Sequence, residues 1–186
     1  MSDDFTPDRA MTNALYGISQ ENWFAGATSL FRRRYQLDAV GADVAILGLP
    51  FDVAVTNRPG TRFGPRAVRA ASSVLSWPGG PWRWETDPFQ NLAVVDTGDL
   101  HFDTGDPAAF AELAEARASA LMADGARLLS LGGDHFVSYP LLKAHAKRYG
   151  PLALIQFDAH SDTWRAPGGR IDHGTMFFHA VEEGLI

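Results

Sequence analysis

The 186-residue chain is 46% hydrophobic and 20% charged, which is typical of one globular domain with a sizeable core and excludes a disordered chain. Its 16 basic and 22 acidic side chains give a net charge of -6, and the basic residues form no block that could neutralise a phosphate backbone, so we expect no nucleic-acid partner. Because the chain has no cysteine, any metal must be held by carboxylate, imidazole or carbonyl groups.

The N-terminal segment, residues 1–36, is irregular in pattern and rich in aromatic residues. We assign it no chemistry and expect it to wrap around the domain formed by residues 37–186. Its first residues, MSDDFTPDRA, lack the basic start and apolar run of a secretory signal, and no stretch approaches the ~20 apolar residues of a membrane span. These features predict a cytoplasmic protein without a membrane partner.

Predicted strands and helices alternate along the rest of the chain. The sequence predicts strands at 43–52, 91–100, 127–135 and 152–160, helices at 64–77, 107–124 and 137–149, and a Gly/Pro-rich loop at 79–90. The second helix is expected to bury one face, made by Phe110, Leu113, Ala114 and Leu121. Continuously apolar strands separated by helices predict an α/β fold with a mostly parallel sheet that is covered on both faces.

Polar residues follow the third and fourth predicted strands. One strand finishes in Gly132-Gly133-Asp134-His135 and the next in Asp158-Ala159-His160-Ser161-Asp162. Because ligands bind outside the carboxyl ends of such strands, we expect both loops to line one crevice. If the extended geometry continues past Asp158, then Asp158, His160 and Asp162 share one side. Carboxylates with imidazole and no thiolate favour Mn or Mg, leave Zn or Fe open, and would suit a two-metal site.

Other polar residues have ordinary structural interpretations when their local sequence is considered alone. His173 is most simply a residue that precedes a helix N-cap, and His145 and His179 are packing or surface residues on helices. The role of His101 is open. The remaining candidates are loop hydrogen-bond acceptors or members of a solvated or ion-paired helix start, and they are Asp96, Asp99, Arg62, Arg66 and Arg69.

Six segments together resemble the ureohydrolase (arginase/agmatinase) family: GLPFD, PGTRFGPRAVR, VVDTGD, LGGDHFVSYPLLKAHAKRYG, FDAHSDTW and DHGTMFFHAVEEGLI. The resemblance runs from about Asp43 to Ile186 and is greatest to bacterial agmatinases. It implies a three-layer α/β/α, arginase-like fold, a homo-oligomer, two Mn²⁺ ions in each complete site, and hydrolysis of a small cationic guanidino substrate to urea and an amine. We expect agmatine as the substrate, with putrescine as the product for polyamine synthesis. Guanidinobutyrase and guanidinopropionase activities are the alternatives.

The resemblance also implies roles for the matched positions. His135 and Asp162 would bind one manganese ion, His160 would bind the other, and Asp158 would bridge them. His173 corresponds to a proton-relay histidine, and this role replaces the interpretation of His173 as a residue before a helix N-cap. We expect His173 and Asp162 to be the catalytic residues.

The segment 163–172 is expected to contact the non-reacting end of the substrate. An amine tail would need an acceptor such as Asp172, whereas a carboxylate tail would need Arg165 or Arg170, and the sequence leaves this choice open.

Family members extend beyond the position that Ile186 matches. They carry there an Asp-x-Asp strand that completes both metal shells, and a glutamate that holds the guanidinium group. This chain matches neither feature, so we expect a C-terminally truncated chain that lacks the last strands of the sheet. Two hypotheses follow: either the sequence represents an agmatinase whose activity belongs to the complete chain, or the 186-residue chain is a non-catalytic fragment that needs a complementing chain.

Overall fold

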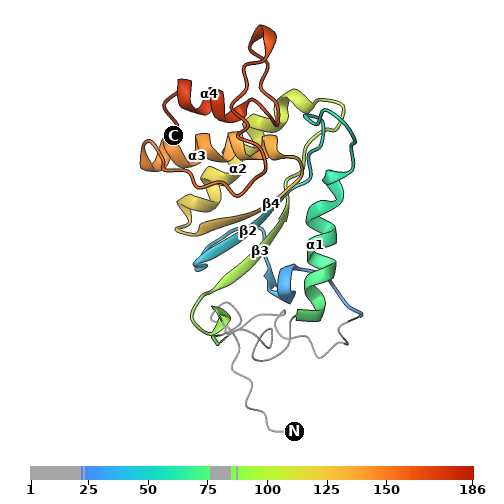
Figure 1. The fold of residues 1–186 in the computed structure, drawn as a ribbon. Coiled ribbons are helices and arrows are strands. Elements are labelled where there is room, and N and C mark those ends of the chain that lie inside the picture. The colour runs from blue at the N-terminus through green and yellow to red at the C-terminus, as the bar shows by residue number, and fades with distance from the viewer. Residues whose placement is uncertain (1–21, 23, 76–84, 87) are drawn as a thin grey trace. The chain divides into compact units, whose positions relative to one another are not determined.

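The computed structural model describes residues 22, 24–75, 85–86 and 88–186, and its elements are drawn in Figure 1. The chain divides into two compact units. The first unit contains residues up to Gly48, Pro65–Asp99 and Leu121–Leu131. The second contains Leu49–Gly64, Leu100–Ala120 and Gly132–Ile186. The polar motifs singled out in the sequence from Gly132 onward all belong to the second unit.

A four-stranded sheet forms the centre of the first unit. Its strands are β1 (Arg34–Tyr35), β2 (Val44–Leu49), β3 (Val94–Asp99) and β4 (Arg127–Gly132), in the spatial order β1-β3-β2-β4. Strand β3 pairs in parallel with both β1 and β2, and nearly every residue of β2 and β3 is buried, as expected for strands inside a parallel sheet. The strands predicted near 43–52, 91–100 and 127–135 are confirmed. Strand β1 lies inside the segment 1–36, where the sequence indicated no regular element.

The four α-helices are α1 (Gly64–Ser72), α2 (Phe110–Ala123), α3 (Ser138–Tyr149) and α4 (Met176–Glu182). The first three confirm the predicted helices. Helix α1 continues as a 3-10 turn to Leu75, while residues 76–77 and 79–84 of the predicted helix and loop lie outside the described residues. Helix α3 ends at Tyr149, and the Gly150 that follows has a φ of 81°, a conformation that glycine adopts without a Cβ clash. With the parallel sheet, these helices establish the α/β class.

The buried face of α2 differs from the prediction at one position. Leu113 is 41% exposed, so its assignment to the buried face is wrong. The residues of the helix that are buried recur at three- and four-residue spacings, and they are Phe110, Ala114, Ala118, Leu121 and Met122. Adding Ala118 and Met122 shifts the stripe away from Leu113 by part of a turn.

The predicted fourth strand, residues 152–160, is wrong. Residues 152–157 have no regular secondary structure, and Ile155 and Phe157 are 81% and 97% exposed. A strand requires a hydrogen-bonded neighbour, and among the described residues no strand pairs with this segment. The apolar sequence of this segment therefore favours a strand, but the segment forms none in this structure.

A buried ion pair anchors α1 beside β3 in the first unit. Asp96 is fully buried and accepts hydrogen bonds from Arg69 Nε at 2.8 Å, Arg69 Nη2 at 2.9 Å and the Leu30 amide at 2.7 Å. Arg69 also pairs with Asp99. Arg69 is thus ion-paired, as one of its two interpretations proposed, and it is buried rather than solvated.

Within the described part of the chain, no helix is both long enough and apolar enough to cross a membrane.

Candidate metal centre

The Gly-Gly-Asp-His turn follows β4 and packs directly against the backbone of the loop after β2. A Cβ at Gly133 would lie 2.4 Å from the carbonyl oxygens of both Leu49 and Phe51, and the Gly133 φ is +24°. The Asp134 amide donates to the Phe51 carbonyl at 2.7 Å. Only glycine allows two backbones to approach this closely, so Gly133 sets the position of the backbone that leads to His135.

Asp134 connects the same two segments through its side chain. The carboxylate is 4% exposed and accepts hydrogen bonds from the amides of Ala54 and Phe136, each at 2.9 Å. Its burial raises the pKa of the carboxyl group, although both amides oppose this shift. Asp134 is also the N-cap of the 3-10 turn that leads into α3. A tight turn with a cap is the ordinary interpretation of Gly-Gly-Asp-His considered alone, and an aspartate just before a predicted helix is the signal for it.

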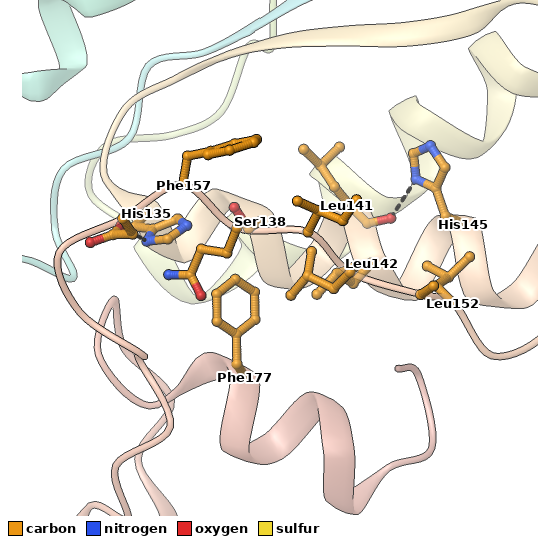
Figure 2. A pocket seen from close by; sticks show the side chains of 13 residues that line it. His135, Ser138, Leu141, Leu142, His145, Leu152, Phe157 and Phe177 are labelled. Carbon is orange, nitrogen blue, oxygen red and sulfur yellow. Dashed lines mark hydrogen bonds and ion pairs between the residues drawn. The ribbon is translucent and has the colours of Figure 1, made fainter.

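His135, Asp158 and Asp162 come together as a compact cluster of possible metal ligands. The His135 Nδ1 atom lies 2.8 Å from Asp162 Oδ2 and 3.3 Å from Asp158 Oδ2. One ligand atom from each residue lies within 4.8 Å of the others. The His135 ring packs nearly perpendicular to the ring of Phe177 of α4, with ring centroids 5.4 Å apart, and Figure 2 shows both rings beside the same pocket. Asp162 is 8% exposed, so a cation would neutralise a carboxylate with little access to water.

His160 lies on the other side of Asp158 and outside that cluster. Its Nδ1 atom is 3.4 Å from Asp158 Oδ1, and its side chain is 73% exposed. The His160 amide donates to the same Oδ1 atom at 2.9 Å, and this bond lowers the pKa of Asp158. The two oxygens of Asp158 therefore face two different imidazoles.

The expected extended geometry of residues 158–162 is wrong. Residues 158–160 are bends, residues 161 and 162 have no regular secondary structure, and Asp162 has a φ of +52°. This turn, and not a strand period of two, directs Asp158 and Asp162 toward His135. Asp162 is held by its backbone carbonyl, which accepts from the Phe177 amide at 3.2 Å.

A second hollow adjoins the cluster and contains His173. Its volume is ≈ 480 Å³, and its lining includes His160, Asp162, Trp164, Arg165 and His173. The His173 Nε2 atom lies 3.2 Å from the Thr56 hydroxyl. The N-cap of α4 is Thr175, two residues after His173.

The charged residues of segment 163–172 are largely committed to one another or to aromatic rings. Asp172 is 8% exposed, and its two oxygens accept from Arg170 Nη2 at 2.8 Å and from the Gly174 amide at 3.0 Å. The Arg165 guanidinium lies 4.7 Å from the centre of the Phe178 ring. Asp172 thus organises its own loop, while Arg165 and Arg170 line the pocket.

The pocket in Figure 2 is a third feature of this region. It has a volume of ≈ 500 Å³ and extends from His135 and Asp158 along apolar residues of α3 and the segment 152–157. His145 lines it too, and its Nδ1 atom is 2.7 Å from the Leu141 carbonyl one turn earlier. His145 and His179 lie on helices α3 and α4, as predicted, while His101 lies exposed in a loop.

Comparison with known proteins identifies relatives that match nearly all of this chain. Agmatinase from Chromobacterium violaceum is 51% identical over 174 residues, which are 92% of this chain and 54% of the relative. Agmatinase from Proteus mirabilis is 49% identical over 95% of this chain and 58% of the relative. The chain therefore spans about half the length of the curated relatives it matches.

Solved structures show the same similarity in three dimensions. A hypothetical agmatinase from Burkholderia thailandensis superposes with a TM-score of 0.87 at 48% identity, covering 94% of this chain and 55% of that one. Proclavaminate amidino hydrolase from Streptomyces clavuligerus has a TM-score of 0.81 at 34% identity, covering 89% of this chain and 56% of that one. The fold is therefore arginase-like. The model of the arginase family matches residues 42–186, and the chain belongs to this family.

Proposed function

We propose that this protein acts in the manganese-dependent hydrolysis of a guanidino compound, and that agmatine is the substrate and putrescine and urea are the products. The observation that carries the proposal is the position of Asp158, whose two carboxylate oxygens lie 3.3 Å and 3.4 Å from the Nδ1 atoms of His135 and His160. A carboxylate between two imidazoles suits a pair of ions. The names of the bacterial relatives at about 50% identity favour agmatine.

The donor set fits manganese. It consists of imidazole and carboxylate groups without thiolate, which is a combination that Mn²⁺ accepts. His135 and Asp162 would hold one ion, His160 would hold the second, and Asp158 would contact both. When bound, such a pair of ions supplies an activated water and stabilises negative charge that develops on the substrate.

The protein's own side chains would bind the substrate and move its proton. His173 lines the same pocket as His160 and Asp162, which supports a role for its imidazole at the departing amine. It would deliver a proton to that nitrogen as a general acid. Asp158 and Asp162 give the site an acidic character that attracts a cationic substrate.

A second substrate class is supported by the contacts of the 163–172 segment. Both oxygens of Asp172 accept from groups of its own loop, one of which is Arg170, while Arg165, Arg170 and Asp172 all line the pocket. A substrate with a carboxylate tail, such as 4-guanidinobutyrate or 3-guanidinopropionate, would find there the guanidinium group of Arg165 and that of Arg170, which is paired with Asp172. Guanidinobutyrase or guanidinopropionase activity is therefore the alternative within the same reaction class.

An alternative of another class is a chain that binds metal without catalysing hydrolysis. Among the described residues, the second ion would have ligands from His160 and Asp158 alone, and the curated relatives are nearly twice as long. Such a chain would need a complementing chain to complete its site. Assembly into a homo-oligomer and a cytoplasmic location are further parts of the proposal, and both derive from the family resemblance and the sequence.

The test combines metal binding with urea release. Calorimetry with Mn²⁺ should give about two ions per chain, and His135→Ala should weaken binding by at least about 100-fold, since loss of a ligand exceeds the 10–100-fold effect of losing a ligand's support. His101→Ala, at an exposed histidine of the same unit, is the matched control and should bind as the unmodified chain does.

Urea release would then be compared for agmatine, 4-guanidinobutyrate, 3-guanidinopropionate and L-arginine. Release from agmatine that His135→Ala abolishes supports the agmatinase proposal. Preference for a carboxylate-tailed substrate selects the alternative substrate class. Binding of Mn²⁺ without urea from any substrate selects the non-catalytic alternative, and equal Mn²⁺ affinity in the His135→Ala and unmodified chains would contradict the metal site itself.

A further inference from the structure

The Thr56 hydroxyl, from the loop after β2, lies 3.2 Å from the Nε2 atom of His173, which is 117 residues later in the sequence. Among the described residues, no hydrogen bond joins the other ring nitrogen, Nδ1, to the protein. The geometry points to Thr56 as a positioning residue for His173: its hydroxyl holds Nε2 and leaves Nδ1 to exchange a proton with the substrate. This inference rests on the proposed function, in which His173 protonates the departing amine.

The loop that carries Thr56 is held at two points on either side of it. On one side, Ala54 donates its amide to the buried carboxylate of Asp134 at 2.9 Å. After Thr56 in the sequence, the Gly60 amide donates at 2.7 Å and Arg62 Nε donates at 2.6 Å to the carboxylate of Asp52, which is 3% exposed. Residue 56 lies between these two attachments, so the backbone that carries its hydroxyl is held on both sides although the residue is exposed.

The backbone of His173 is held from its own side. Asp172 Oδ1 accepts from the Gly174 amide at 3.0 Å, and the Thr175 hydroxyl accepts from the Asp172 amide at 2.9 Å. The same hydroxyl donates to the Arg170 carbonyl at 3.0 Å. These bonds hold the backbone at His173 in place but do not set the rotation of the imidazole ring, because the ring torsion of histidine has two broad and nearly equivalent minima. A partner for one nitrogen is needed to choose between them, and Thr56 supplies it.

The direct test is the state of the His173 ring. Long-range ¹H–¹⁵N correlation spectra of the full 186-residue chain report the tautomer and the hydrogen bonding of each histidine nitrogen. Thr56→Val should shift the His173 Nε2 resonance, and Thr56→Ser should restore it, because serine keeps the hydroxyl group. Thr61→Val removes an exposed hydroxyl in the 3-10 turn that follows this loop and should leave the His173 resonances unchanged. Unaltered His173 resonances in Thr56→Val would overturn the inference.

The kinetic test separates positioning from general stability. In the Mn²⁺-loaded protein, Thr56→Val should lower kcat by about fivefold, the effect of losing one ordinary hydrogen bond in the transition state, with KM changed by less than about twofold. Thr56→Ser should recover kcat, and Thr61→Val should not change it. An unchanged kcat in Thr56→Val would overturn the positioning role. If the unmodified chain releases no urea, the proposed catalytic function fails for this chain, and the resonances alone decide whether Thr56 holds the His173 ring.

Discussion

Removal of the Asp134 carboxylate should destabilise the protein, because two partly buried amide hydrogen bonds depend on it. In Asp134→Ala, the amides of Ala54 and Phe136 lose acceptors that now lie 2.9 Å away. An unsatisfied buried amide costs about 1–3 kcal/mol, and because these two hydrogen bonds are only partly buried, the expected loss is about 2–5 kcal/mol in the free energy of unfolding. Asp134→Asn keeps one carbonyl oxygen as an acceptor and should lose about half as much.

The assay is urea denaturation followed by far-ultraviolet circular dichroism. With a denaturant slope of about 2 kcal/mol per molar urea, the Asp134→Ala midpoint should fall by about 1–2.5 M. Asp106→Ala is a matched control, because Asp106 is also the N-cap of a 3-10 turn but its side chain makes no capping bond. Its midpoint should change by no more than about 0.3 M. Equal midpoints for Asp134→Ala and the unmodified protein would refute the view that Asp134 connects the two loops.

Three further substitutions test other parts of the structure. The Arg62 hydrogen bond holds the pKa of Asp52 below its ordinary value of 3.8, so ionised Asp52 stabilises the folded state fully above about pH 5 and loses this effect as the pH falls below 3.8. The difference in unfolding free energy between the unmodified protein and Asp52→Asn, measured by unfolding at several pH values, should follow the same course. Gly133→Ala should cost more than about 2 kcal/mol in thermal unfolding, because its Cβ meets backbone, whereas Gly168→Ala has a φ of +75° but open space and should cost about 1 kcal/mol. Similar costs would show that the clash is not decisive. Phe157→Ser should change stability by less than about 0.5 kcal/mol, since the ring is 97% exposed, and a loss of 3 kcal/mol or more would mean that the segment is buried after all.

The segment 152–157 is apolar in sequence but largely exposed in the structure. Its sequence, Leu-Ala-Leu-Ile-Gln-Phe, favours a buried strand, yet Ile155 and Phe157 are in water. Exposed apolar segments with unpaired backbone favour association with another chain.

The sequence alone determined the elements whose formation depends on neighbours along the chain. The apolar runs of β2 and β3 and the helical periodicity of α1, α2 and α3 identify these elements because strand and helix patterns repeat over two to four residues. The same local information singled out His135 and Asp158 as candidate ligands, through their positions at the ends of apolar runs. It also placed Leu113 in the core, where a shift of part of a turn makes the prediction wrong.

The tertiary structure decided everything that depends on residues far apart in the sequence. The burial of Arg69 against Asp96, the attachment of Asp134 to Ala54, and the meeting of Thr56 with His173 each join positions at least 27 residues apart. The segment 152–157 has a strong strand pattern but forms no strand, because no neighbouring strand pairs with it among the described residues. Local sequence sets the conformation that a segment prefers, but hydrogen-bond ladders, buried ion pairs and ligand clusters exist only when a second segment supplies the partner.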